Sequence, residues 1–208
     1  MRRKIGILCL VLGFALMASA GLLLWHNQAE DTAAETAVTE LIPQLLEKIP
    51  QVPPEEKIIQ QLTPVEFLPP SAFEMTRVEI DGHEYIGYLS LPTLELELPI
   101  MADWDYKKLQ IAPCRYTGSI NGRDLVLMAH NYGSHFGRIS ELKPGDLVLF
   151  TDMDGHTTQY VVESRDVLPP DAVEEMTSGN YDLTLFTCTY GGKSRVTVHC
   201  SRLMGKNP

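Results

Sequence analysis

The hydrophobic pattern divides the 208-residue chain into one long apolar stretch near the N-terminus and a later region of short alternating runs. The apolar stretch runs from Ile5 to Trp25 without a charged residue. A helix of this length spans roughly 30 Å at 1.5 Å per residue, about the thickness of the hydrocarbon core of a bilayer. The pattern therefore predicts a transmembrane anchor over residues 5–25, after a short tip at residues 1–4.

The residues around this stretch predict its orientation. Residues 2–4 are Arg-Arg-Lys, and the acidic pair Glu30-Asp31 follows the apolar run. Basic residues stay on the cytoplasmic side, so we expect a single-pass protein of the cell membrane with residues 1–4 inside and the main body outside. A cleaved signal peptide is the alternative, because residues 18–20 (Ala-Ser-Ala) form a plausible cleavage site. The length of the run and Trp25 favour a retained anchor.

Residues 26–72 have the composition of a stalk. Seven of the fourteen prolines lie in this segment, together with many acidic residues and few aromatic ones. Apolar residues at helical spacing, such as Leu41 and Leu45, predict short helices that the prolines interrupt. We interpret the segment as a semi-rigid acidic spacer, with packing against the following domain as the alternative.

Residues 73–208 predict a mainly β domain. Leu94, Leu96 and Leu98 alternate with Glu95 and Glu97, which is typical of a strand with one buried face. Similar runs separated by turn residues predict strands at 85–91, 94–98, 125–129, 147–151, 158–167, 182–187 and 195–203, with helical segments at 103–109, 138–142 and 169–176. Many short strands and few helices favour a sandwich or a barrel.

Charge and cysteine content narrow the possible functions. The net charge of −10 argues against a nucleic-acid partner. Cys9 lies in the apolar stretch, whereas Cys114, Cys188 and Cys200 lie in the body. An odd number of exported cysteines leaves at least one without an internal partner, which points to a reactive thiol. A Cys114–Cys200 disulfide and three free thiols both remain open.

Three residues form a candidate catalytic set. Cys188 ends the predicted strand 182–187, and Arg195 begins the next strand after a short loop, so the guanidinium can return to the same sheet edge. A nearby cation favours the thiolate form that acts as a nucleophile. His130 ends the strand 125–129, and histidine is the usual acid or base beside a nucleophilic cysteine. The structural alternatives are a buried cysteine, a histidine that caps a strand and an arginine paired with a surface acid.

Other histidines compete for these roles. His135 lies within the loop after His130, where we expect it to be held less firmly. His199 shares a strand face with Arg195, and we interpret it as exposed to solvent. A zinc site is the main rival chemistry, but its possible ligands lack the short spacings of zinc motifs, so we expect no metal or cofactor. Those possible ligands are His130, His135, Cys188, His199 and Cys200.

The segment Thr184-Leu185-Phe186-Thr187-Cys188 resembles the Thr-Leu-x-Thr-Cys signature of sortases, the membrane-anchored cysteine transpeptidases of Gram-positive bacteria. Residues 86–99, 125–131 and 142–146 are similar to further parts of that family, although Ala129 stands where the family often has glycine. The likeness extends from Tyr85 to Leu203 and includes the ordered histidine, cysteine and arginine.

The resemblance implies a closed β-barrel of about eight strands with short helices, preceded by an N-terminal transmembrane helix. It implies that Cys188 attacks the Thr–Gly bond of an LPXTG-like sorting signal, that His130 acts as general acid and base, and that Arg195 positions the substrate and stabilises the oxyanion. The implied partners are surface proteins with a C-terminal sorting signal and an amine acceptor, either a peptidoglycan precursor or a pilin lysine.

Two other functions remain open at this point. One is a non-catalytic extracellular β domain that binds surface proteins or glycans. The other is a purely hydrolytic cysteine peptidase, in which water replaces the amine. The residues do not separate hydrolysis from transfer, because both reactions use the same acyl-enzyme.

Overall fold

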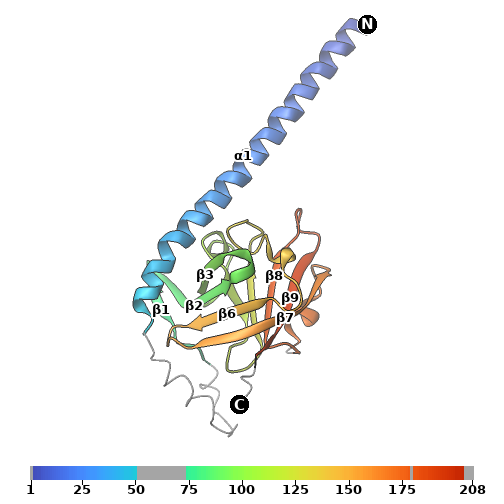
Figure 1. Cartoon of the computed structure of the whole chain (residues 1–208). Helices are drawn as coiled ribbons and strands as arrows, with labels where there is room; N and C mark the ends of the chain where they lie inside the picture. The colour runs from blue at the N-terminus through green and yellow to red at the C-terminus, as the bar shows by residue number, and fades with distance from the viewer. Residues whose placement is uncertain (1, 51–73, 179, 204–208) are drawn as a thin grey trace.

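The structure, a computed structural model, describes residues 2–50, 74–178 and 180–203 and consists of a β-barrel with one long helix beside it (Figure 1). The helix is α1 (Arg2–Lys48), and a short helix, α3 (Val173–Thr177), precedes β8. The strands are β1 (Val78–Ile80), β2 (His83–Leu91), β3 (Leu96–Met101), β4 (Cys114–Thr117), β5 (Leu125–Ala129), β6 (Leu147–Asp152), β7 (Thr157–Leu168), β8 (Leu183–Cys188) and β9 (Arg195–Arg202).

The sheet closes on itself. Its strand order is β1-β2-β3-β4-β5-β8-β9-β7-β6, and β6 pairs back with β2. Strands β2 to β9 thus form a closed eight-stranded barrel, with β1 added beside β2, which confirms the predicted fold class. The closure requires a glycine: a Cβ on Gly87 would lie 2.1 Å from the Thr151 carbonyl oxygen, and its φ of 145° is one that other residues rarely adopt.

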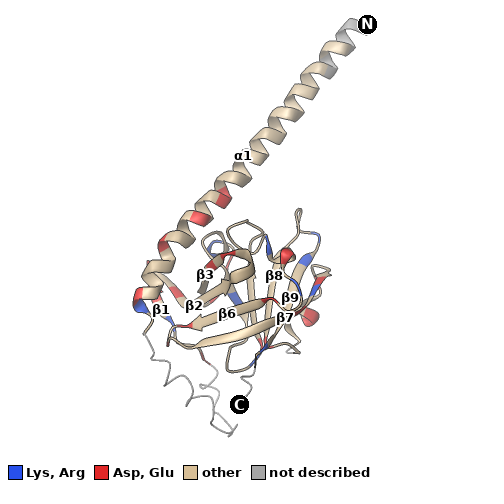
Figure 2. Ribbon diagram, viewed as in Figure 1, with Lys and Arg blue, Asp and Glu red and all other residues tan. Residues whose placement is uncertain are grey.

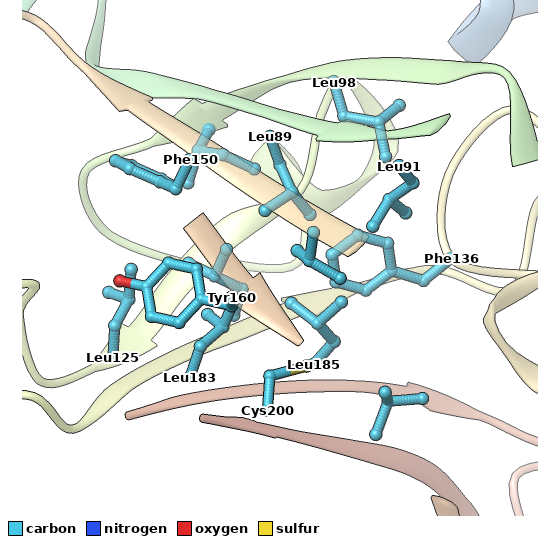
Figure 3. Close-up of a cluster of buried hydrophobic side chains, with 14 of the residues drawn as sticks. Leu89, Leu91, Leu98, Leu125, Phe136, Phe150, Tyr160, Leu183, Leu185 and Cys200 are labelled. Atoms are coloured by element: carbon cyan, nitrogen blue, oxygen red, sulfur yellow. The ribbon is translucent and has the colours of Figure 1, made fainter. Parts of the chain in front are cut away.

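The barrel interior is filled by aliphatic and aromatic side chains from alternate strand positions (Figure 3). Leu183 and Leu185 of β8 point inward and are fully buried, and Cys200 of β9 lies beside them as a free thiol. Such an interior packs about as densely as a molecular crystal, which makes the barrel a rigid support for groups at its edges. Other members of this core are Leu89, Leu91, Leu98, Leu125, Phe136, Phe150 and Tyr160.

Local differences from the predicted elements occur where a turn interrupts an apolar run. The predicted strand at 94–98 starts at Leu96, because Pro92–Leu94 forms a 3-10 turn and Glu95 adopts a left-handed φ of 55°. The helical segment expected at 103–109 is a turn at Lys108–Gln110, and the other short helices are Ile139–Glu141 and α3. Strands β1 and β4 were not predicted.

The interpretation of residues 26–50 as a spacer is wrong. These residues continue α1 through Pro43, without the predicted breaks, as far as Lys48. Ala34, Leu41, Leu45 and Ile49 are buried, and the last three pack with residues of β1, β2 and β3 in a second apolar cluster. Residues 51–72, the rest of the predicted stalk, lie outside the described residues.

Burial explains why Pro43 does not end the helix. A proline inside a helix costs about 3 kcal/mol, because it removes one hydrogen bond and crowds the preceding turn. Burying a leucine or isoleucine side chain stabilises by about 1.5–3 kcal/mol. Leu41, Leu45 and Ile49 together exceed the cost of the proline.

The other half of α1 protrudes from the barrel (Figure 1). Leu22, Leu23 and Leu24 are 63–71% exposed, and so is Trp25 at 70%. Within the described residues, α1 is the one helix that is long and apolar enough to cross a membrane, judged by length and composition.

We predict that Leu45→Ala destabilises the protein by about 2–5 kcal/mol, because it leaves a cavity where α1 meets the barrel. Leu45 is fully buried, whereas its neighbour Leu46 is 38% exposed, so Leu46→Ala is a matched control with little expected effect. Thermal unfolding of the full chain in detergent measures both. Equal stability of the two variants and the wild type would show that α1 does not pack in solution.

Candidate active site

The pairing of three strands brings His130, Cys188 and Arg195 into one row. Strands β5 and β8 are parallel neighbours, with Ala129 opposite Thr187, so the next residues, His130 and Cys188, leave the barrel at the same edge. Strand β9 lies antiparallel on the other side of β8, with Arg195 directly opposite Cys188. Adjacent strands lie about 4.8 Å apart, so the row places an imidazole, a thiol and a guanidinium on or just beyond consecutive strands.

Hydrogen bonds fix the strand ends that carry this row. The Thr187 hydroxyl donates to the Ala129 carbonyl oxygen at 2.8 Å, which ties β8 to β5 one residue before the thiol. After Cys188, the Thr189 N–H donates to the Ser194 carbonyl at 3.0 Å, and the Gly192 N–H donates to the Thr189 carbonyl at 2.8 Å. Gly192 has a φ of 70°, which lets the chain turn this tightly. The partly exposed Cys188 thus lies on a rigid edge.

The Arg195 guanidinium lies over its own loop. It donates to the carbonyl oxygens of Gly192 at 3.0 Å and Ser194 at 3.1 Å. Within the described residues Arg195 forms no ion pair with a carboxylate, so the alternative of a surface pair with an acid does not hold there. The guanidinium keeps further N–H groups for a ligand at the edge.

His130 is half-buried just beyond β5. Burial lowers the pKa of its imidazole, and the nearby carboxylate of Glu30 acts in the opposite direction. The ring of Tyr132 lies across it, with centroids 4.9 Å apart. His130 is therefore held between a strand end and an aromatic ring.

His130 and Cys188 line the same pocket, which has a volume of about 510 Å³. Three segments form its walls: the loop after β5, the loop after Cys188, and one face of α1. The α1 residues are Leu24, Asn27, Gln28, Glu30 and Asp31. Figure 2 shows that the acidic residues of α1 are confined to the half that runs beside the barrel. The sequence did not identify Glu30 and Asp31 as site residues, because their contacts are about 100 positions away in the chain.

Two histidines occupy places other than those expected. His135 is completely buried, so it is not the loosely held loop residue that we expected. His199 is only 4% exposed, so the solvent-facing interpretation is wrong. Strand alternation does place His199 on the outer face, but Tyr181 stacks on it with centroids 4.2 Å apart and covers it.

The candidate zinc ligands do not form a cluster in the described part of the chain. The group of possible metal ligands found there is instead Asp152, Asp154 and His156, at the turn between β6 and β7. The Asp152 carboxylate accepts the backbone N–H groups of Asp154 and His156 at 3.0 and 2.8 Å, which accounts for its position as a turn residue.

The comparison with known families shows which family the chain belongs to. A profile described as the sortase domain matches residues 89–203, which is more than half of the chain and includes all three members of the row. The chain belongs to the sortase family.

The chain shares only about a quarter of its sequence with individual sortases. The chain is 28% identical over 125 residues to "Sortase A" of Bacillus anthracis, and the match covers 57% of this chain and 59% of that relative. The structure of sortase C1 from Streptococcus suis is 28% identical, with a TM-score of 0.51, covering 59% of this chain and 74% of that one. Sortase C of Streptococcus pneumoniae, 24% identical with a TM-score of 0.58, shares the fold over 81% of this chain and 99% of its own.

We predict that a thiol alkylator distinguishes the three cysteines of this sortase domain. Cys114 and Cys200 are fully buried, and burial raises the pKa of each thiol to about 12, so both resist alkylation in the native state. Peptide mapping after iodoacetamide treatment at pH 7.5 should find Cys188 modified, and Cys114 and Cys200 modified only after denaturation. Comparable native labelling of all three would contradict the closed barrel.

We also predict acid destabilisation through His135. Burial lowers its pKa from about 6.5 to about 4, so the unfolded chain binds a proton between these values that the folded chain does not. The stability from the neutral imidazole is present above pH 6.5 and is lost as the pH falls to 4, by roughly 3 kcal/mol. Urea unfolding at pH 7 and pH 4 should show a smaller loss for His135→Phe than for the wild type. Equal losses would rule out this contribution.

Proposed function

We propose that this sortase is a membrane-anchored cysteine transpeptidase that cleaves an LPXTG-like sorting signal at the Thr–Gly bond and transfers the acyl group to an amine. The observation that carries the proposal is the row of His130, Cys188 and Arg195 on β5, β8 and β9, within the family match. A row that holds an acid–base group, a thiol and a cation side by side suits acyl transfer through a covalent intermediate.

In the first half of the proposed reaction, the Cys188 thiolate attacks the threonine carbonyl carbon and forms a C–S bond. The carbonyl oxygen takes the negative charge, and the Arg195 N–H groups donate to it. The protonated His130 then gives its proton to the leaving glycine amine as the C–N bond breaks. A thioester and a free amine result, and His130 is left neutral.

In the second half, an acceptor amine replaces the leaving group. Neutral His130 removes a proton from the acceptor as its nitrogen attacks the thioester, and the tetrahedral intermediate collapses with loss of the Cys188 thiolate. A new amide forms, and His130 is protonated again. A peptidoglycan precursor or a pilin lysine has the required amine, and surface proteins with a C-terminal sorting signal supply the acyl group.

The proposed location follows from α1. Its apolar half remains in the cell membrane as a single span, residues 2–4 stay in the cytoplasm, and the barrel lies outside. The exposed Leu22 to Trp25 support this arrangement, because they would otherwise place a large apolar surface in water.

The test incubates the full chain, in detergent or a nanodisc, with sorting-signal peptides and amines. Mass spectrometry should detect a thioester on Cys188 and a transpeptidation product. Cys188→Ala should form neither, His130→Ala should lower turnover by at least about 10³-fold, and Arg195→Ala should lower it by about 10²–10³-fold. Arg195→Lys should recover little, because lysine keeps the charge but lacks the planar fork.

His156→Ala is the matched control, because this partly exposed histidine lies at the distant β6–β7 turn. It should retain wild-type turnover. Product formation by Cys188→Ala would refute the mechanism, and hydrolysis without transfer at saturating amine would identify a peptidase instead. No thioester with any peptide would favour a binding domain.

A further inference from the structure

The first turns of α1 beyond the apolar stretch lie against the loop that carries His130. This part of the helix lines the pocket shared by Cys188 and His130. It is fixed there because the same helix is buried further along at Leu41 and Leu45. The anchor helix therefore reaches the active site, although it is separate from the barrel strands.

Asp31 holds this loop at Ser134. The Ser134 N–H donates to Asp31 Oδ1 at 3.2 Å, and the Ser134 hydroxyl donates to the same oxygen at 2.9 Å. The neighbouring Gly133 is also close: a Cβ there would lie 3.3 Å from Asp31 Oδ2. Hydrogen bonds to a carboxylate are about twice as strong as neutral ones, so a single aspartate on α1 secures the middle of the loop.

Glu30 holds the same loop at Tyr132. The Tyr132 hydroxyl donates to Glu30 Oε2 at 3.3 Å. Burial and the Glu30 carboxylate raise the pKa of Tyr132 to about 12, so the hydroxyl keeps its proton. The Tyr132 ring lies between His130 and His135, with centroid distances of 4.9 and 5.4 Å. A hydrogen bond from α1 thus fixes the ring that packs on His130.

We propose that Glu30 and Asp31 are positioning residues for His130, so that the turns of α1 next to the membrane hold the acid–base group of the reaction. This inference rests on the proposed function, since it assigns His130 the acid–base role. Asp31 fixes the loop backbone, and Glu30 acts through Tyr132. Neither carboxylate is required to touch the substrate.

Several charged or titratable groups surround His130. Glu30 and Asp31 come from α1, Tyr132 and His135 from its own loop, and Cys188 from β8 across the pocket. Glu30 also lies 3.3 Å from the ring nitrogen of His26, one turn earlier on α1. Because Glu30 favours the protonated imidazole, its removal should lower the pKa of His130.

The experiment uses the full chain in nanodiscs and compares Glu30→Ala, Asp31→Ala and Tyr132→Phe. Each should lower kcat by about 10-fold, since each removes one or two hydrogen bonds of the loop, while KM for the peptide stays within about 2-fold. Glu30→Ala and Tyr132→Phe remove the same bond, so the double variant should lose less than the product of the two effects. Glu35→Ala, an exposed acid one turn further along α1, should behave as wild type.

A second readout does not depend on turnover. Histidine-selective NMR of the full chain should show a lower pKa for His130 in Glu30→Gln, which keeps the shape and removes the charge, and no change in Glu35→Gln. The His130→Ala spectrum assigns the signal.

The outcomes separate this inference from the proposed function. Wild-type kcat and an unshifted His130 titration in the Glu30 and Asp31 variants would overturn the positioning role while leaving the transpeptidase intact. Faster turnover in these variants would overturn it as well, because α1 would then obstruct the pocket. If no peptide gives a thioester, the proposed function fails, and the His130 titration still tests the contact with α1.

Discussion

The row of His130, Cys188 and Arg195 depends on the pairing register of β5, β8 and β9. Because strand side chains alternate between two faces, a slip of β8 by one residue would turn Cys188 into the barrel and bring Thr187 out. The inward-facing Leu183 and Leu185, both fully buried, oppose such a slip. The hydrogen bond from the Thr187 hydroxyl to the Ala129 carbonyl oxygen also favours this register, because a shifted strand would not bring the two groups together. The packed interior thereby determines where the thiol lies.

The sequence predicted the position of a candidate site residue where that position depends on the end of a single strand. Cys188 and His130 each follow an apolar run, and both were placed correctly at strand ends. Their proximity was harder to predict, because β5 and β8 are parallel neighbours that lie 58 residues apart. No sequence pattern predicted that pairing, and the resemblance to sortases supplied only the roles of the two residues. The four-residue β4 has too short and too mixed a pattern to be recognised alone.

The remaining differences arise from contacts between distant segments. Alternation placed His199 on the outer face of β9, but no local pattern shows that Tyr181 covers it. Likewise, the proline rule predicted a break at Pro43, whereas burial of Leu41 and Leu45 keeps the helix continuous. Glu30 and Asp31 look like ordinary acids after an apolar run. Their partners lie 102 and 103 residues further along the chain, where sequence patterns carry no signal.

Because α1 is continuous, it joins the apolar half, which we propose spans the membrane, directly to the barrel. Trp25 and Asp31 are six residues apart, which corresponds to roughly 9 Å of helix, so in the proposed membrane arrangement the pocket opens close to the lipid headgroups. Each residue also turns the helix by about 100°. Removing one residue from this short interval would rotate the apolar half about the helix axis relative to the barrel. The number of residues between these two positions thus sets which face of the apolar half lies on the same side of the helix as the pocket.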